Sequence, residues 1–171
     1  MKKCIVVAVL LAAFIATPAF AKEGYYLGLY VPTCSITGDA GSGTSSESGW
    51  GLRLGNGFNR YFSFEGNYAK VKDLKNYAVD FKLNFPLTTL DSAQIMSLEP
   101  YALIGYDYSE LGSSTTVKAN GLQFGFGIEL YLFKELSVNA GWTKSKITLD
   151  TTPKVDGDIN TIDLGLIYHF I

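Results

Sequence analysis

A strict two-residue alternation along residues 120–133 constrains the fold of this chain more than any other feature. The stretch reads NGLQFGFGIELYLF, and large apolar side chains occupy every second position from Leu122 to Leu132. Successive side chains of an extended strand point to opposite faces, so the stretch predicts a strand with one apolar and one glycine-rich face. The apolar face would form the core of a soluble protein, or would contact lipid in a membrane barrel.

The same alternation recurs elsewhere, in segments about as long as tilted strands that cross a bilayer. Together with 120–133, the segments are 25–31, 50–54, 62–68, 77–85, 100–108, 136–142 and 162–170. An even number of antiparallel strands brings both chain ends to one side, as barrel closure requires. We therefore predict an all-β fold, an eight-stranded antiparallel up-and-down β-barrel.

The N-terminus has the features of a secretory signal peptide. Lys2 and Lys3 precede an apolar run at 5–16, and Ala19-Phe20-Ala21 matches the small-x-small pattern of a cleavage site. We expect residues 1–21 to be removed and residues 22–171 to form the barrel domain. The alternative is an uncleaved membrane anchor, but the run is shorter than the roughly 20 apolar residues of a spanning helix.

Composition and charge narrow the function classes. The chain is 47% hydrophobic and only 18% charged, which is little charge for a soluble surface. Without residues 1–21 it carries 12 basic and 16 acidic side chains, a formal net charge of −4. We expect no nucleic-acid partner, because that would require a basic patch. Cys34 is the one cysteine after residue 21, and is either a free thiol or an intermolecular link.

The predicted connections differ in length. Residues 56–60 and 133–135 predict tight turns, whereas 34–48, 71–76, 109–119 and 146–159 predict longer polar loops. Short turns at one end and longer loops at the other are typical of outer-membrane barrels. The connection at 86–97 is an exception, because its place in the order predicts a short turn.

Two features of the strand faces favour a transmembrane barrel. The polar face is rich in glycine, which weakens a strand unless something packs against its backbone, and the interior of a small barrel supplies that packing. Aromatic side chains mark both ends of the apolar face, as bilayer interfaces select. One predicted belt comprises Tyr25, Phe58, Phe62, Phe85 and Phe170, and the other Trp50, Tyr68, Tyr77, Tyr106 and Trp142. The alternative is a secreted lipocalin-like barrel with an apolar cavity.

With these features the chain resembles the outer membrane protein beta-barrel family, which includes the outer membrane protein A transmembrane domain and opacity-type surface proteins. The stretches that carry the resemblance are GWGLRLGNGFNRYFSFEGNY, EPYALIGYDY, GLQFGFGIELYLFKELSVNAGW and INTIDLGLIYHF. The resemblance implies a location in the cell outer membrane, periplasmic turns, surface loops, contact with outer-membrane lipids and insertion by the barrel assembly machinery. Family members typically end on an aromatic sorting residue, which here is displaced by one position because Ile171 follows Phe170.

The polar face carries charges that would face the lumen. Unpaired charges are costly in a narrow, poorly hydrated space, so we predict a paired network. Within it Glu65 would lie between Arg53 and Lys82, with a hairpin near residues 73–74 placing Glu65 opposite Lys82. The alternative is that some charges lie near the barrel mouths and are solvated. The predicted lumen charges are Arg53, Glu65, Asp80, Lys82, Glu129 and Asp163.

We expect no catalytic, metal or cofactor site. His169 is the single histidine and has no partner nearby in sequence, and one His with one Cys does not make a metal site. The G-x-G runs lie within predicted strands, so they do not form a phosphate-binding loop. The lumen of an eight-stranded barrel is just wide enough for side chains, which argues against a wide pore.

We therefore interpret the chain as a small outer-membrane barrel with a structural or adhesin-like surface-interaction role. Its Ser- and Gly-rich loops would be available to an extracellular partner. The alternatives are a narrow or gated low-conductance pore and an outer-membrane lipid-modifying enzyme.

Overall fold

The computed structural model describes residues 24–38, 46–87, 97–112, 117–149 and 155–170. The predicted signal peptide at 1–21 lies outside the described residues. The described strands are β1 (Gly24–Gly38), β2 (Glu47–Ser48), β3 (Trp50–Gly57), β4 (Phe62–Val71), β5 (Leu74–Asn84), β6 (Ser97–Leu111), β7 (Val117–Tyr131), β8 (Leu136–Leu149) and β9 (Val155–His169). Because β2 and β3 both pair with β1 and only Gly49 separates them, they occupy one strand position.

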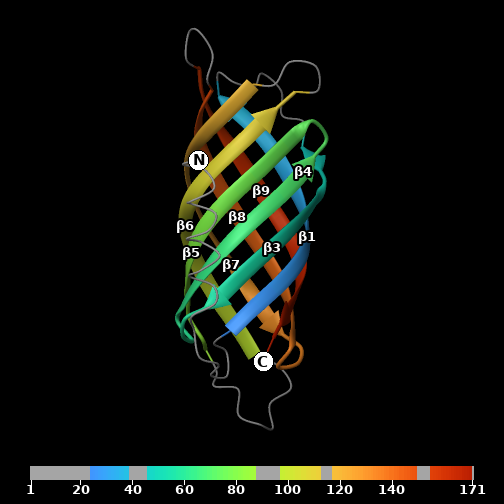
Figure 1. The fold of residues 1–171 in the computed structure, drawn as a ribbon, viewed down its shortest axis with the longest axis vertical. Helices are drawn as coiled ribbons and strands as arrows, with labels where there is room; N and C mark the ends of the chain where they lie inside the picture. The colour runs from blue at the N-terminus through green and yellow to red at the C-terminus, as the bar shows by residue number, and fades with distance from the viewer. Residues whose placement is uncertain (1–23, 39–45, 88–96, 113–116, 150–154, 171) are drawn as a thin grey trace, which may run out of the picture.

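The strands form a closed antiparallel barrel (Figure 1). Each main strand pairs with the next along the chain, and β9 pairs with β1 over thirteen residue pairs to close the sheet. The prediction of an eight-stranded antiparallel up-and-down barrel is therefore confirmed. No helix in the described part of the chain is long and apolar enough to cross a membrane.

The strands run obliquely to the barrel axis (Figure 1). Following directly opposed residues around the barrel from Leu27 leads back to Thr37, ten residues further along the same strand; the path is Leu54, Gly66, Val79, Tyr106, Leu122, Lys146 and Asp158. A shear of this kind accompanies strand tilts of roughly 35–45°. Residues at the same height along the barrel axis are therefore not directly opposed. From one strand to the next they are offset by about one residue from the hydrogen-bonded partner.

The apolar face of each membrane-crossing strand points outward. In β7, Leu122 and Phe126 are 64% and 62% exposed, whereas Gln123 and Glu129 are each only 5% exposed. This arrangement is the reverse of a soluble barrel, because the polar side chains are the buried ones. It answers the question that residues 120–133 raise, since their phenylalanines and leucines form the outer wall.

The two ends of the barrel differ. We call the end that holds Gly24 and His169 the terminal end, and the end that holds the Lys72–Asp73 turn the loop end. At the loop end the strands continue beyond their predicted limits, with β1 reaching Gly38 and β8 reaching Leu149. The long loop predicted at 71–76 was wrong, because β4 and β5 are joined by a two-residue turn in which Lys72 has a φ of 51°.

The predicted loops at 34–48, 109–119 and 146–159 were too long for the same reason. Cross-strand pairing continues through their outer parts, for example between Ser109 and Ala119 and between Lys146 and Asp158. In the unexpected connection between β5 and β6, residues 88–96 lie outside the described residues.

Candidate functional site

The centre of the lumen holds a buried network of charged side chains from different strands. Arg53 projects from β3, and its guanidinium contacts two carboxylates, with Nη2 3.0 Å from Asp163 Oδ1 and Nε 3.4 Å from Glu65 Oε1. Its Nη1 donates to Asn139 Oδ1 at 2.7 Å. The guanidinium carbon also lies 4.7 Å from the ring centroid of Tyr30. Arg53 thereby links β3 through the lumen to β4, β8 and β9.

Glu65 on β4 is the shared counter-ion of this network. Its Oε1 faces Arg53, while its Oε2 lies 3.4 Å from Lys82 Nζ and accepts a hydrogen bond from the Tyr26 hydroxyl at 2.9 Å. Lys82 Nζ is also 3.8 Å from Glu129 Oε2. The structure therefore places Glu65 between Arg53 and Lys82, with Glu129 on the other side of Lys82.

The register differs from the expectation in one detail. Asp80 lies directly opposite Glu65, and Lys82 lies opposite Ser63, so that Lys82 reaches Glu65 diagonally. Asp80 forms no ion pair with another described residue. Instead its carboxylate accepts hydrogen bonds from Asn67, at 2.8 Å, and from Gln123. Asn67 also donates to Glu65 at 3.0 Å and so joins the two neighbouring carboxylates.

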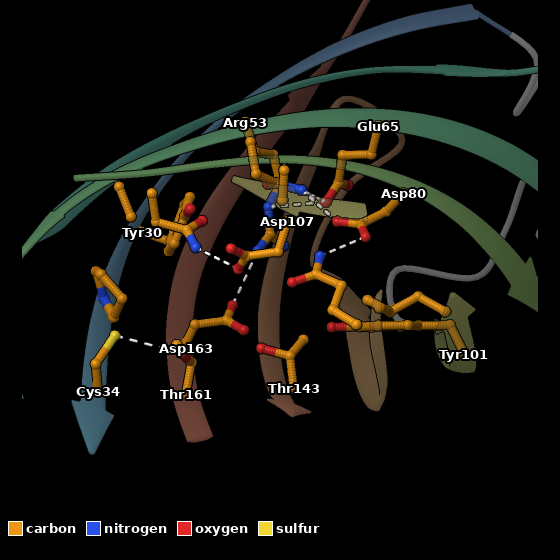
Figure 2. A pocket seen from close by; sticks show the side chains of 17 residues that line it. Tyr30, Cys34, Arg53, Glu65, Asp80, Tyr101, Asp107, Thr143, Thr161 and Asp163 are labelled. Carbon is orange, nitrogen blue, oxygen red and sulfur yellow. Dashed lines mark hydrogen bonds and ion pairs between the residues drawn. The ribbon is translucent and has the colours of Figure 1, made fainter. Parts of the chain in front are cut away.

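A cavity of about 40 Å³, lined by both polar and apolar side chains, lies on the loop-end side of the network. Arg53, Glu65, Asp80 and Asp163 project into this space from different strands (Figure 2). A volume of this size holds about two or three water molecules. Asp107 also lines the cavity, and its carboxylate accepts hydrogen bonds from Ser109 at 2.8 Å and Ser145 at 2.9 Å. Asp107 is not among the lumen charges predicted from the sequence.

An apolar cluster closes the lumen above this cavity, at the loop end. None of these residues was predicted to fill the lumen. The sequence could have predicted them, because near the loop end inward apolar side chains alternate with outward polar ones such as Lys70, Lys75 and Lys146. The cluster comprises Cys34, Val71, Leu74, Ala119, Ile147, Leu149 and Ile159, all less than 9% exposed, with Ile36, Leu111 and Val117 packed against it.

Inward tyrosines pack onto glycines of the neighbouring strand. Tyr26 lies directly opposite Gly55, and Tyr30 directly opposite Gly51. A methyl group on either glycine would overlap the opposing ring. The hydroxyl of Tyr101 in the same way approaches Gly127 on β7. The glycines of the polar face thus provide the room in which lumen tyrosines lie.

His169 has partners that its local sequence does not reveal. Its Nε2 lies 2.9 Å from Glu129 Oε1 and 3.1 Å from Ser137 Oγ, and Ser137 donates to the same carboxylate oxygen at 2.6 Å. A catalytic Ser–His–acid triad places the serine and the acid at opposite ring nitrogens. Here both approach one nitrogen, and Ser137 is fully buried.

Aromatic side chains lie at both ends of the outer apolar band. At the loop end, rings of neighbouring strands contact each other, with centroids 5.6 Å apart for Trp50 and Tyr68 and 5.1 Å for Tyr68 and Tyr77. Trp142 lies deeper in the band, with its ring 5.2 Å from that of Phe126. At the terminal end, the outward aromatic residues include Tyr25, Phe58, Phe62, Phe85 and Phe170.

Comparison with known proteins identifies the family. The family model described as "Outer membrane protein beta-barrel domain" matches residues 6–170. This chain belongs to that family. It is therefore a small β-barrel protein of the cell outer membrane. A comparison with curated protein sequences found no match.

Solved structures of other proteins share the fold of this chain. The crystal structure of Neisserial surface protein A is 16% identical, with a TM-score of 0.60, and the match covers 85% of this chain and 97% of that one. The attachment invasion locus protein of Yersinia pestis is 20% identical, with a TM-score of 0.58 and coverage of 86% and 99%. The same protein in complex with the heparin analogue sucrose octasulfate gives 20% identity, a TM-score of 0.57 and the same coverage. At these identities the likeness shows the fold alone.

Proposed function

We propose that this outer-membrane protein has a structural or adhesin-like role, in which a filled barrel holds recognition loops at the cell surface. The observation that carries the proposal is the closed lumen. The charge network fills the middle of the barrel, and the apolar cluster fills its loop end. A barrel filled in this way leaves its rim and loops as the surface for a partner.

The orientation follows from the same family. We infer that the terminal end faces the periplasm and that the loop end faces outward, because barrels of this kind have short periplasmic turns. Two of the three connections at the terminal end, β3–β4 and β7–β8, span only residues 58–61 and 132–135, whereas the β5–β6 connection is longer. On this orientation the predicted recognition loops lie outside the cell, although their central residues, 39–45 and 113–116, lie outside the described residues.

Loop replacement tests this role. In one variant, residues 39–45 and 113–116 are both replaced by short Gly-Ser linkers, and cells displaying wild type or variant are allowed to adhere to surfaces coated with heparin, collagen or fibronectin. We expect wild-type cells to adhere to at least one surface and the variant to lose that adhesion while its barrel still folds. Equal adhesion of both would contradict the proposal.

A narrow or gated pore is the second candidate, and small cavities on both sides of the charge network favour it. The cavity of about 40 Å³ lies toward the loop end, and one of about 20 Å³ borders Lys82, Glu129 and His169 toward the terminal end. Single-channel recording of the refolded protein in planar bilayers distinguishes the candidates. A filled scaffold gives no steady conductance, whereas a gated pore gives discrete openings.

A lipid-modifying activity has less support from the site. A hydrolytic serine must be reachable by substrate and activated by a base. Ser137, the serine beside His169, is buried in the lumen, and both it and Glu129 contact the same ring nitrogen of His169, Nε2. We therefore assign the contacts of His169 to the packing of the terminal end.

A further inference from the structure

Two lysines stand directly opposite each other on the outer wall of the barrel. Lys70 near the end of β4 pairs in register with Lys75 near the start of β5, and both side chains are exposed. The two-residue turn between the strands fixes this register. Directly opposed residues have Cβ atoms about 4.5–5.5 Å apart, and like charges in such a pair destabilise the sheet. The position therefore favours an anion that neutralises both ammonium groups.

Within the described residues no ion pair includes Lys70 or Lys75, although Glu110 stands directly opposite Lys75. On the same rim, Lys72 pairs with Glu47, and Lys144 lies 2.8 Å from Asp158. The Glu47 carboxylate accepts a hydrogen bond from Lys72 and raises the pKa of its ammonium group. Neither of these pairs involves Lys70 or Lys75.

The cross-strand row that contains the lysine pair carries more positive than negative charges. Lys75 faces Glu110 on β6, and Glu110 in turn faces Lys118 on β7. This cross-strand row therefore combines three ammonium groups with one carboxylate. Asp73 in the adjoining turn adds one further negative charge at the rim.

The surface below the lysine pair is aromatic and then apolar. Tyr68 lies two residues below Lys70 on β4, Tyr77 lies two residues from Lys75 on β5, and their ring centroids are 5.1 Å apart. Toward the middle of the band, Leu52 and Val79 are outward and exposed. This order of cation, tyrosine and aliphatic side chains matches the order of headgroup, interface and acyl chains in a bilayer leaflet.

We propose that Lys70 and Lys75 bind a phosphate group on the headgroup of a lipid in the outward-facing leaflet. Ammonium groups form charge-assisted hydrogen bonds with phosphate oxygens, and basic clusters beside membrane-crossing segments attract anionic headgroups. The lysines extend from the lipid-facing wall, not from the loops, and tyrosine rings lie immediately beneath them. These features favour a lipid phosphate over a soluble anion or a sulfated polysaccharide.

A titration of lipid A tests the site, because its sugar headgroup carries phosphates. The full mature protein is refolded in neutral detergent micelles, and binding is measured by native mass spectrometry for wild type and for Lys70→Gln/Lys75→Gln. The expected Kd of the double variant is about 30-fold higher, since each lysine near an anionic headgroup contributes a factor of about five. Lys134→Gln, an exposed lysine in the β7–β8 turn, is the matched control and is expected to bind like wild type.

Further arms identify the anion. Wild type should bind phosphate-free lipid A no more tightly than the double variant binds lipid A. Millimolar inorganic phosphate should not displace lipid A from wild type. Unchanged lipid A binding by a folded double variant would overturn the proposal. Equal binding of the phosphate-free lipid, or displacement by inorganic phosphate, would also overturn it. If the double variant does not fold, Lys75→Gln alone decides, with an expected change of about fivefold.

Discussion

The ring of Tyr26 on β1 occupies the space that a side chain at Gly55 on β3 would need. The two residues are direct cross-strand neighbours inside the lumen, and the Tyr26 hydroxyl is held by its hydrogen bond to Glu65 at 2.9 Å. The ring therefore cannot move aside without breaking a contact of the charge network. Glycine at residue 55 is thus a requirement of lumen packing.

Gly55→Ala should destabilise the barrel by about 1–3 kcal/mol, the usual cost of overpacking a well-filled interior. Urea unfolding in lipid vesicles measures this change in the free energy of unfolding. Gly66→Ala is the matched control, because Gly66 faces outward and an added methyl group would lie 3.8 Å from its nearest neighbour, Leu54 O. Equal stability of the two variants would show that the Tyr26 ring is not confined.

Glu65→Gln should lower stability more than any surface charge change. It removes the counter-ion that Arg53 and Lys82 share, and breaking a buried ion pair typically costs about 3–5 kcal/mol. Thermal unfolding in detergent, followed by circular dichroism, measures the effect. Glu47→Gln removes the exposed partner of Lys72 and should cost no more than about 1 kcal/mol. An unchanged melting temperature for Glu65→Gln would deny the network a structural role.

Phe126→Arg tests which face meets lipid. Phe126 is 62% exposed near the middle of the apolar band, where an arginine costs about 2–4 kcal/mol. Gln123→Arg, three residues away on the inward face, would place the new charge beside the Asp80 carboxylate and should be tolerated better. Folding yield into vesicles ranks the two variants, and the opposite ranking would mean that the faces are reversed.

Cys34 should react slowly with a maleimide while the barrel is folded. Its side chain points inward, is 7% exposed and contacts Thr161 Oγ1 at 3.3 Å within the apolar cluster. Thr33→Cys in a Cys34→Ser background places a thiol on the outward side of the same strand and should be labelled much faster. Rapid labelling of native Cys34, or a disulfide-linked dimer on non-reducing gels, would contradict this placement.

The membrane-crossing part of the fold could be predicted because lipid imposes a simple rule on each strand. Phe124, Phe126 and Ile128 alternate with small or polar residues, and the bilayer allows only one assignment of the two faces. The inward direction of Arg53, Glu65 and Lys82 follows from the same alternation. Their partners are less predictable, since register depends on turn length, and the two-residue turn places Asp80 opposite Glu65.

The loop end was harder to predict because the meaning of polarity reverses above the bilayer. There the outward residues Lys144 and Lys146 meet water or headgroups, and the inward Ile147 and Leu149 pack against each other. In such a strand the apolar side chains face outward within the bilayer and inward above it. If only outward apolar side chains are taken as the mark of a strand, the part above the bilayer is mistaken for a polar loop. The contacts of His169 could not be predicted for another reason, because its partners Glu129 and Ser137 come from other strands.

The apolar cluster at the loop end also makes the packing of the barrel independent of the segments that connect its strands there. Val71, Ile147 and Ile159 are buried within this cluster inside the strand ends, and the pairing of β9 with β1 closes the sheet without any residue of those connecting segments. Foreign peptides spliced into residues 39–45 or 113–116 should therefore leave the membrane sealed. The chain would then serve as a compact carrier for displaying antigens or binding peptides on living cells.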